Sequence, residues 1–98
     1  NMKKYRRKAK IICQSGINEG QYACILLNPP IRTGKAMIYS LFDQCMEHLA
    51  TDGHFWIVMR KQHGAQSAIH YLQEKGYEVE KMAREKGYWV MKISKAGN

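Results

Sequence analysis

The stretch Tyr22–Lys35 reads YACILLNPPIRTGK, and the rest of the chain is organised around it. Its apolar run, Ala23–Leu27, has no polar alternation, which predicts a strand buried on both faces, as in a parallel sheet. Pro29 and Pro30 then stop the strand, because neither has a backbone N–H for ladder pairing. Asn28 is therefore expected just beyond the carboxyl end of a central strand, where open α/β sheets bind ligands.

The chemistry of this segment suits an amino group. Asn28 offers a carbonyl acceptor and an amide donor, and the backbone carbonyls of Pro29 and Pro30 are acceptors outside the sheet ladder. Such a group of acceptors fits an exocyclic amine of a nucleobase. The structural alternative is a turn, because Asn before Pro is a common turn signal. The apolar strand directly before Asn28 favours the functional interpretation.

A helix and a second strand are predicted after this segment. Ala36–Ala50 carries apolar residues at three- and four-residue spacing, which predicts an amphipathic helix. Thr51-Asp52-Gly53 is interpreted as the stop signal of that helix. The apolar His54–Met59 predicts a second buried strand, parallel to the first, with the helix as a right-handed crossover. Arg60-Lys61 then follows at the same edge as Asn28.

The remaining segments complete an α/β fold. Lys10–Gln14 predicts a short strand, and Ala65–Lys75 predicts a second helix that ends at Gly76. Tyr77–Ala83 and Tyr88–Ser94 predict two strands that are antiparallel, because a hairpin-length connection joins them.

Composition restricts the function classes. The 98 residues make one domain, and 16 Lys+Arg against 8 Asp+Glu give a formal net charge of +8, which favours a polyanionic partner such as nucleic acid over a merely solubilising surface. Six of these cations lie in Met2–Lys10, read either as a phosphate-binding arm or as an exposed helix end. No stretch approaches the roughly 20 apolar residues of a membrane span, and no secretory signal is recognised. The expected location is the cytoplasm, with Cys13, Cys24 and Cys45 as buried free thiols.

Two other kinds of site are not supported by the spacing of the residues. The histidines show no metal-ligand spacing, so no metal site is predicted. Gly34-Lys35 superficially suggests a phosphate loop. Pro29 stands where that pattern needs glycine, and Ala36 replaces the required Ser or Thr.

The strings NPPIRTGK, HFWIVMRKQHGAQSA and GYWVMK resemble the C-terminal part of the methyltransferase small domain family, which includes ribosomal small-subunit RNA guanine-N2 methyltransferases. The resemblance implies methyl transfer from S-adenosylmethionine to an exocyclic amine of RNA, with guanine N2 of rRNA as the target. It implies catalytic roles for Asn28, Pro29 and Pro30. It implies substrate contacts from Ile31, Arg32, Lys35, Arg60 and Lys61, with Ile31 as an apolar wall and the cations on phosphates.

The resemblance also implies a partial Rossmann-like sheet. The family orders its strands 3-2-1-4-5-7-6 with the seventh antiparallel, and residues 22–98 resemble its C-terminal half, after a basic segment and short strand at 1–21. The family's first two strands have no counterpart, nor does the glycine-rich loop that holds the cofactor, so no cofactor-binding residue is assigned. The chain then looks truncated, and we expect little S-adenosylmethionine binding by itself.

The missing strands have a structural consequence. Without the family's first strand, Tyr22–Leu27 has an exposed apolar edge, which predicts a homodimer unless Lys10–Gln14 folds over that edge. Two other interpretations stay open: a non-catalytic RNA-binding α/β fragment, and a non-functional remnant.

Overall fold

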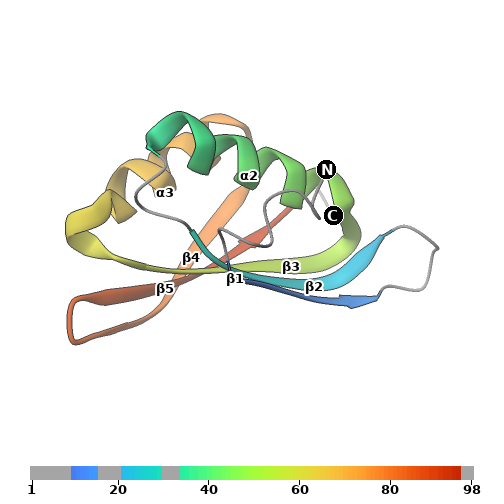
Figure 1. The fold of residues 1–98 in the computed structure, drawn as a ribbon. Coiled ribbons are helices and arrows are strands. Elements are labelled where there is room, and N and C mark those ends of the chain that lie inside the picture. Colours follow the sequence, from blue (N-terminus) through green and yellow to red (C-terminus); the bar gives the residue numbers. More distant parts are fainter. Residues whose placement is uncertain (1–9, 16–20, 30–33, 96–98) are drawn as a thin grey trace.

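The computed structural model describes residues 10–15, 21–29 and 34–95. The elements in chain order are β1 (Lys10–Ser15), β2 (Tyr22–Asn28), α2 (Lys35–His48), β3 (Leu49–Arg60), the 3-10 turn η2 (Lys61–His63), α3 (Ala65–Glu74), β4 (Glu78–Glu85) and β5 (Tyr88–Ser94). The five strands form one sheet in the order β1-β2-β3-β5-β4. Both helices lie on one face of this sheet, so the fold has two layers (Figure 1).

The central unit is the predicted β2-α2-β3 crossover. β2 and β3 are parallel, with Ile25 opposite Phe55 and Leu27 opposite Ile57. All four of these side chains are fully buried beneath the helices. The apolar stripe of α2 packs onto the same core through its buried residues Ile38, Leu41, Phe42, Cys45 and Met46. The apolar periodicity of the sequence therefore predicted this unit correctly.

The C-terminal hairpin is also confirmed. β5 pairs antiparallel with both β3 and β4. The strand bounds differ slightly from the prediction, because β4 begins at Glu78 and continues to Glu85. The order β2-β3-β5-β4 reproduces the 4-5-7-6 part of the sheet that the family resemblance implied, with an antiparallel seventh strand.

The interpretation of Thr51-Asp52-Gly53 as a helix stop was wrong. The helix ends earlier, at His48, because the fully buried Leu49 adopts an extended backbone (φ −79°, ψ 135°) and begins β3. Gly53 lies within β3 and is buried. A Cβ atom at this position would lie 2.9 Å from the carbonyl oxygen of Ala23. The glycine therefore permits a close approach of β3 to the backbone of β2.

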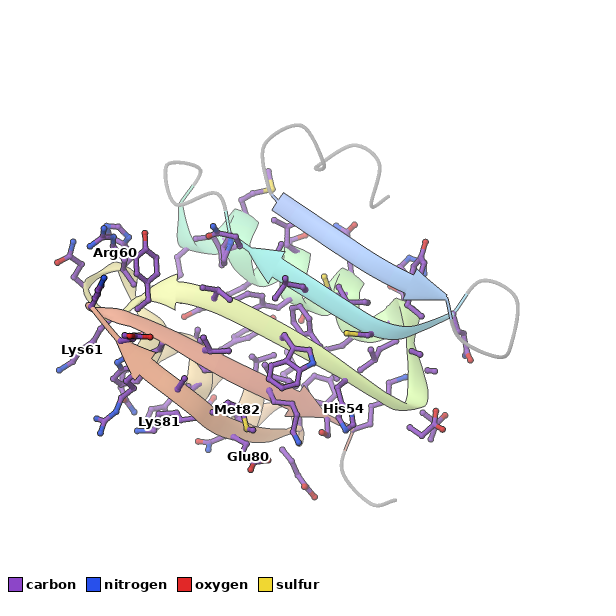
Figure 2. The ribbon with its side chains drawn as sticks, turned by 90° about the horizontal axis from the view of Figure 1, so that it is seen from below. His54, Arg60, Lys61, Glu80, Lys81 and Met82 are labelled. Carbon is purple, nitrogen blue, oxygen red and sulfur yellow. The ribbon has the colours of Figure 1, made fainter. Side chains whose placement is uncertain are left out.

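The expectation that β2 is buried on both faces was also wrong. Ile25 and Leu27 are fully buried, whereas the alternating Cys24 and Leu26 are only half-buried. The reason is topological: α2 and α3 both belong to connections that advance in the same direction across the sheet, and right-handed connections place such helices on one face. No helix in the described part of the chain covers the opposite face, seen in Figure 2.

We call this uncovered surface the open face and define it by Cys24, Leu26, Trp56, Val58 and Val90, which are all half-buried. Cross-strand pairing places Leu26 beside Trp56 and Val58 beside Val90. The open face is therefore a continuous, largely apolar surface on the three central strands.

The outer edge of β2 is covered within the chain. β1 pairs antiparallel with β2, with Lys10 opposite Asn28 and Ile12 opposite Leu26. The predicted short strand is thus present, and of the two alternatives drawn from the sequence the structure takes the folded-over strand. The exposed β2 edge on which the homodimer prediction depended is not there. β1 occupies the place next to β2 that the family resemblance assigns to the first strand.

Candidate functional site

Asn28 lies at the carboxyl end of β2, where the sequence predicted it. It is the last residue of the strand, and it is exposed. The next residue, Pro29, is buried, so it anchors the chain directly after the strand. An exposed amide on a strand end fixed in this way is presented to solvent with little backbone freedom.

Several predicted site residues cannot be placed. Pro30, Ile31 and Arg32 lie outside the described residues, and their roles stay predictions. The chain is described again from Gly34, and Lys35 follows as the exposed first residue of α2.

Arg60 and Lys61 lie at the same edge of the sheet as Asn28, because β2 and β3 are parallel and Leu27 pairs with Ile57. Arg60 ends β3, and its guanidinium carbon lies 4.6 Å from the centre of the Tyr88 ring. Lys61 is exposed, and its backbone N–H donates a 2.9 Å hydrogen bond to the carbonyl oxygen of Gly87. Their roles as phosphate contacts stay predictions.

A small pocket of about 100 Å³ lies between the start of α2, the end of β3 and the start of α3. It is lined by Gly34, Lys35, Ile38, Tyr39, Met59, His63, Gly64 and Ala68. Burial raises the pKa of the Tyr39 hydroxyl, so this group keeps its proton at neutral pH and is available as a donor. The Tyr39 ring is stacked on Tyr71, with ring centres 4.1 Å apart at 18°, which fixes its position.

This pocket does not fit a whole S-adenosylmethionine molecule. Sites for small molecules and cofactors usually occupy about 300–1,000 Å³, and this pocket has about 100 Å³. β1 occupies the side of β2 where the family resemblance places the strand that carries the glycine-rich loop. This pocket therefore provides room for a small group only.

The described residues contain no group of three or more His, Cys, Asp or Glu side chains that could hold a metal ion. None of their helices is long and apolar enough to cross a membrane.

Tyr88 and Trp89 are the functional candidates that sequence reasoning missed. Tyr88 is 37% exposed and faces Arg60 across the antiparallel β3–β5 pair. Lys81 and Lys61 approach the Trp89 ring at 4.8 and 6.0 Å. The register of β5 against β3 brings Tyr88 to Arg60, and the pairing of β4 with β5 brings Lys81 to Trp89. The sequence does contain the Tyr-Trp pair, although nothing local relates it to Arg60.

Comparisons with known proteins agree with this architecture. The family model described as "Methyltransferase small domain" matches residues 1–92. The chain is 43% identical over 82 residues to the uncharacterized protein YbxB of Bacillus subtilis (strain 168). The matched region is 83% of this chain and 41% of that relative, so the chain spans less than half the length of the relative. The chain belongs to the methyltransferase small domain family.

Proposed function

We propose that this chain carries the target-binding part of an S-adenosylmethionine-dependent methyltransferase that acts on an exocyclic amine of RNA, with guanine N2 of ribosomal RNA as the specific target. Family membership supports methyl transfer. The observation that carries the choice of target is the exposed Asn28 amide, which follows β2 into buried Pro29 and lies at the same edge of the sheet as the cations Arg60 and Lys61. The amide carbonyl would accept a hydrogen bond from the amine, and the cations would contact the adjacent phosphates.

The chain's own contribution to such a reaction is binding and orientation. Holding a nucleophilic amine in one position supplies much of the rate in a transfer from an already activated donor. S-Adenosylmethionine supplies the methyl group in this family. Because the described pocket does not fit it, we assign no cofactor contact to a residue of this chain.

The test changes the RNA rather than the protein, by removing the N2 amine of one guanosine. Two single-stranded RNAs that differ only by guanosine or inosine at one position differ by the N2 amine. One lost hydrogen bond of about 1 kcal/mol corresponds to about fivefold in affinity. We expect the wild type to prefer guanosine by about this factor and Asn28→Ala to show no preference. Equal affinity of the wild type for both RNAs would contradict the proposal.

A second candidate function is RNA binding without catalysis. The net charge of +8 supports it, as does the small pocket. Methyl-transfer assays with added S-adenosylmethionine separate the two functions: transfer that Asn28→Ala abolishes supports the enzyme, whereas RNA binding without transfer supports the binding module.

We also propose that the chain works in the cytoplasm and self-associates. Cys24 and Cys45 form no disulfide bond, in keeping with a reducing compartment. Because β1 covers the edge of β2, we now place the contact between copies on the open face. Fractionation of cells that express the tagged chain tests the first proposal, and light scattering tests the second.

A further inference from the structure

The turn between β4 and β5 contains an unfavourable backbone conformation. Lys86 and Gly87 have φ angles of 53° and 82° and connect the paired residues Glu85 and Tyr88. Two-residue hairpin turns with two positive φ angles favour Asn-Gly, because most L side chains are strained there. Lys86 is the only non-glycine residue with positive φ in the described part of the chain. A strained backbone position is a reason to ask what its side chain does.

This turn lies at the same edge of the sheet as Asn28. β5 is antiparallel to β3, so it begins where β3 ends, with Tyr88 opposite Arg60. The hydrogen bond from the Lys61 N–H to the Gly87 carbonyl fixes the turn against the end of β3. Two strand spacings of about 4.8 Å separate β2 from β5, and the register places Asn28 level with Val90, three to four residues from the turn. The turn is therefore roughly 15 Å from Asn28. At about 3.4 Å per stacked nucleotide, this distance corresponds to about four nucleotides.

The residues around the turn carry an excess of positive charge. We call the surface formed by Arg60, Lys61, Lys81, Arg84, Lys86 and Tyr88 the hairpin tip. Figure 2 shows Arg60, Lys61 and Lys81 towards this end of the sheet. In the described part of the chain the ion pairs are Lys75–Asp43 and Lys92–Glu80, and neither involves a cation of the hairpin tip. Glu85 is the one carboxylate in the segment 84–89.

The hairpin tip also presents an aromatic ring, Tyr88, beside one of these cations. Tyr88 is 37% exposed, and the Arg60 guanidinium lies 4.6 Å from its ring centre. A shallow, open depression lies along residues 84–89 at the turn. An exposed aromatic ring next to cations is a combination that binds single-stranded nucleic acid, by base stacking and phosphate contacts.

We propose that the hairpin tip is a docking site for single-stranded RNA, in which Lys86 and Arg84 contact phosphates about four nucleotides from the target and Tyr88 stacks on a base. This inference rests on the proposed function, because it assumes that RNA enters at Asn28. In this arrangement the hairpin tip binds the RNA strand while the amide carbonyl of Asn28 accepts a hydrogen bond from the target amine. The strain at Lys86 is then retained because the turn presents a cation at this point.

The sharpest variant is Lys86→Asn, because it removes the charge while placing a favoured residue in the turn. A labelled single-stranded RNA of about 12 nucleotides serves as the probe, a length within the range that single-strand binders cover. Fluorescence anisotropy between about 50 and 200 mM KCl gives the slope of log affinity against log salt. Each phosphate contact contributes about −0.7 to this slope.

We expect the slope to become less steep by about 0.7 in Lys86→Asn and by about 1.4 in Lys86→Asn/Arg84→Gln. The matched control is Lys75→Gln, which removes an exposed lysine that pairs with Asp43 in the helical layer and should leave the slope unchanged. Lys86→Asn should also raise the melting temperature, so unfolding cannot explain its lost affinity. An unchanged slope in both hairpin variants would overturn the proposal.

The stacking contact is tested separately. Tyr88→Ala should weaken RNA binding by about fivefold to a hundredfold, which is the range expected when one base-stacking contact is lost. Tyr88→Phe keeps the ring and should keep wild-type affinity. Equal affinity of Tyr88→Ala and Tyr88→Phe would remove Tyr88 from the site. These results are independent of the guanosine–inosine comparison, which tests Asn28. Equal affinity of the wild type for the guanosine and inosine RNAs, together with a less steep salt slope in the hairpin variants, contradicts the proposed function alone.

Discussion

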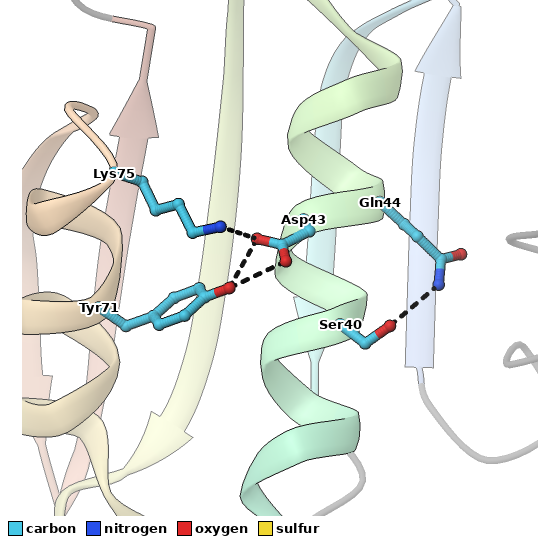
Figure 3. A network of polar contacts seen from close by, with 5 residues as sticks. All are labelled: Ser40, Asp43, Gln44, Tyr71 and Lys75. Atoms are coloured by element: carbon cyan, nitrogen blue, oxygen red, sulfur yellow. Dashed lines mark hydrogen bonds and ion pairs between the residues drawn. The ribbon is translucent and has the colours of Figure 1, made fainter.

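The hydroxyl group of Tyr71 on α3 donates to the carboxylate of Asp43 on α2, at 2.9 and 2.8 Å from its two oxygens (Figure 3). Lys75 lies one helical turn after Tyr71, with its Nζ atom 3.7 Å from the same carboxylate. The Tyr71 ring is stacked on Tyr39 of α2. These contacts join the two helices.

Replacing Tyr71 by Phe removes the hydrogen bond and keeps the stacked ring. We expect a loss of about 1–2 kcal/mol in the free energy of unfolding, the range for a hydrogen bond to a charged group that is partly exposed. Urea denaturation measures it. Tyr39→Phe is the matched control and should change stability by less than about 0.5 kcal/mol. Equal losses in the two variants would show that the Asp43 contact is not the cause.

The same contact predicts a dependence of stability on alkaline pH. Burial, and then the hydrogen bond to Asp43, raises the pKa of Tyr71 above its ordinary value. The hydrogen bond with Tyr71, and then the charge of Asp43, raises the pKa of Lys75 as well. A raised folded-state pKa means that the stabilisation is complete below the ordinary value, about 10 for tyrosine, and is lost as the pH rises through the folded-state pKa.

We therefore expect the stability difference between wild type and Tyr71→Phe to be constant up to about pH 9 and to shrink above about pH 10. Urea denaturation at a series of pH values measures this difference. A difference that stayed constant, or grew, at alkaline pH would contradict the assignment.

Gly53→Ala tests the close approach of β3 to β2. The added Cβ atom would lie 2.9 Å from the Ala23 carbonyl oxygen and 3.0 Å from that of Tyr22. Backbone atoms of a central strand cannot move aside easily, so we expect a destabilisation of about 1–3 kcal/mol. Thermal unfolding measures it, with the exposed neighbour Asp52→Ala as the control. If Gly53→Ala were as stable as the wild type, β2 and β3 could move apart at this point without loss of stability, which would contradict the prediction.

The isolated 98-residue chain should bind S-adenosylmethionine weakly or not at all. The physical reason is the pocket of about 100 Å³, which is smaller than the sites that hold cofactors. Isothermal titration calorimetry measures the binding. Micromolar affinity would show that the part of the site present in this chain suffices.

Self-association through the open face is the prediction for assembly. Burying about 400 Å² of apolar surface would contribute on the order of 10 kcal/mol, against association costs of roughly 4–15 kcal/mol. The mass measured by light scattering should therefore rise with concentration. Val58→Asp, in the open face, should abolish this rise, whereas Gln66→Asp on the exposed side of α3 should not. A mass of 11.4 kDa at every concentration would contradict the prediction.

The sequence predicted those parts of the fold that local periodicity determines. The apolar run before Asn28, the stripe of α2 and the short β4–β5 connection each indicate their element without knowledge of the rest of the chain. The helix stop predicted at Gly53 was wrong because a glycine after a helix and a glycine where two strands approach closely look alike in sequence. The burial predicted for both faces was wrong at Leu26 and Trp56, because an apolar run does not show which layer covers each side chain.

The sequence likewise predicted some residues of the candidate site and not others. Asn28 and Arg60 follow apolar strands, so a parallel pair places them at one edge. Tyr88 could not be assigned, because its contact with Arg60 depends on the register of β5 against β3. The strain at Lys86 depends on the turn conformation, which hairpin length alone leaves open.

The two-residue turn at Lys86-Gly87 also affects the order in which the sheet forms. The β4–β5 hairpin closes locally, and such hairpins form in about 1–10 μs. The pairing of β2 with β3 must wait for the α2 crossover, and contacts so distant in sequence slow folding. If the hairpin is formed in the transition state, Lys86→Asn speeds folding and Gly53→Ala mainly speeds unfolding. A lysine that holds RNA would then delay the first step by which the sheet assembles.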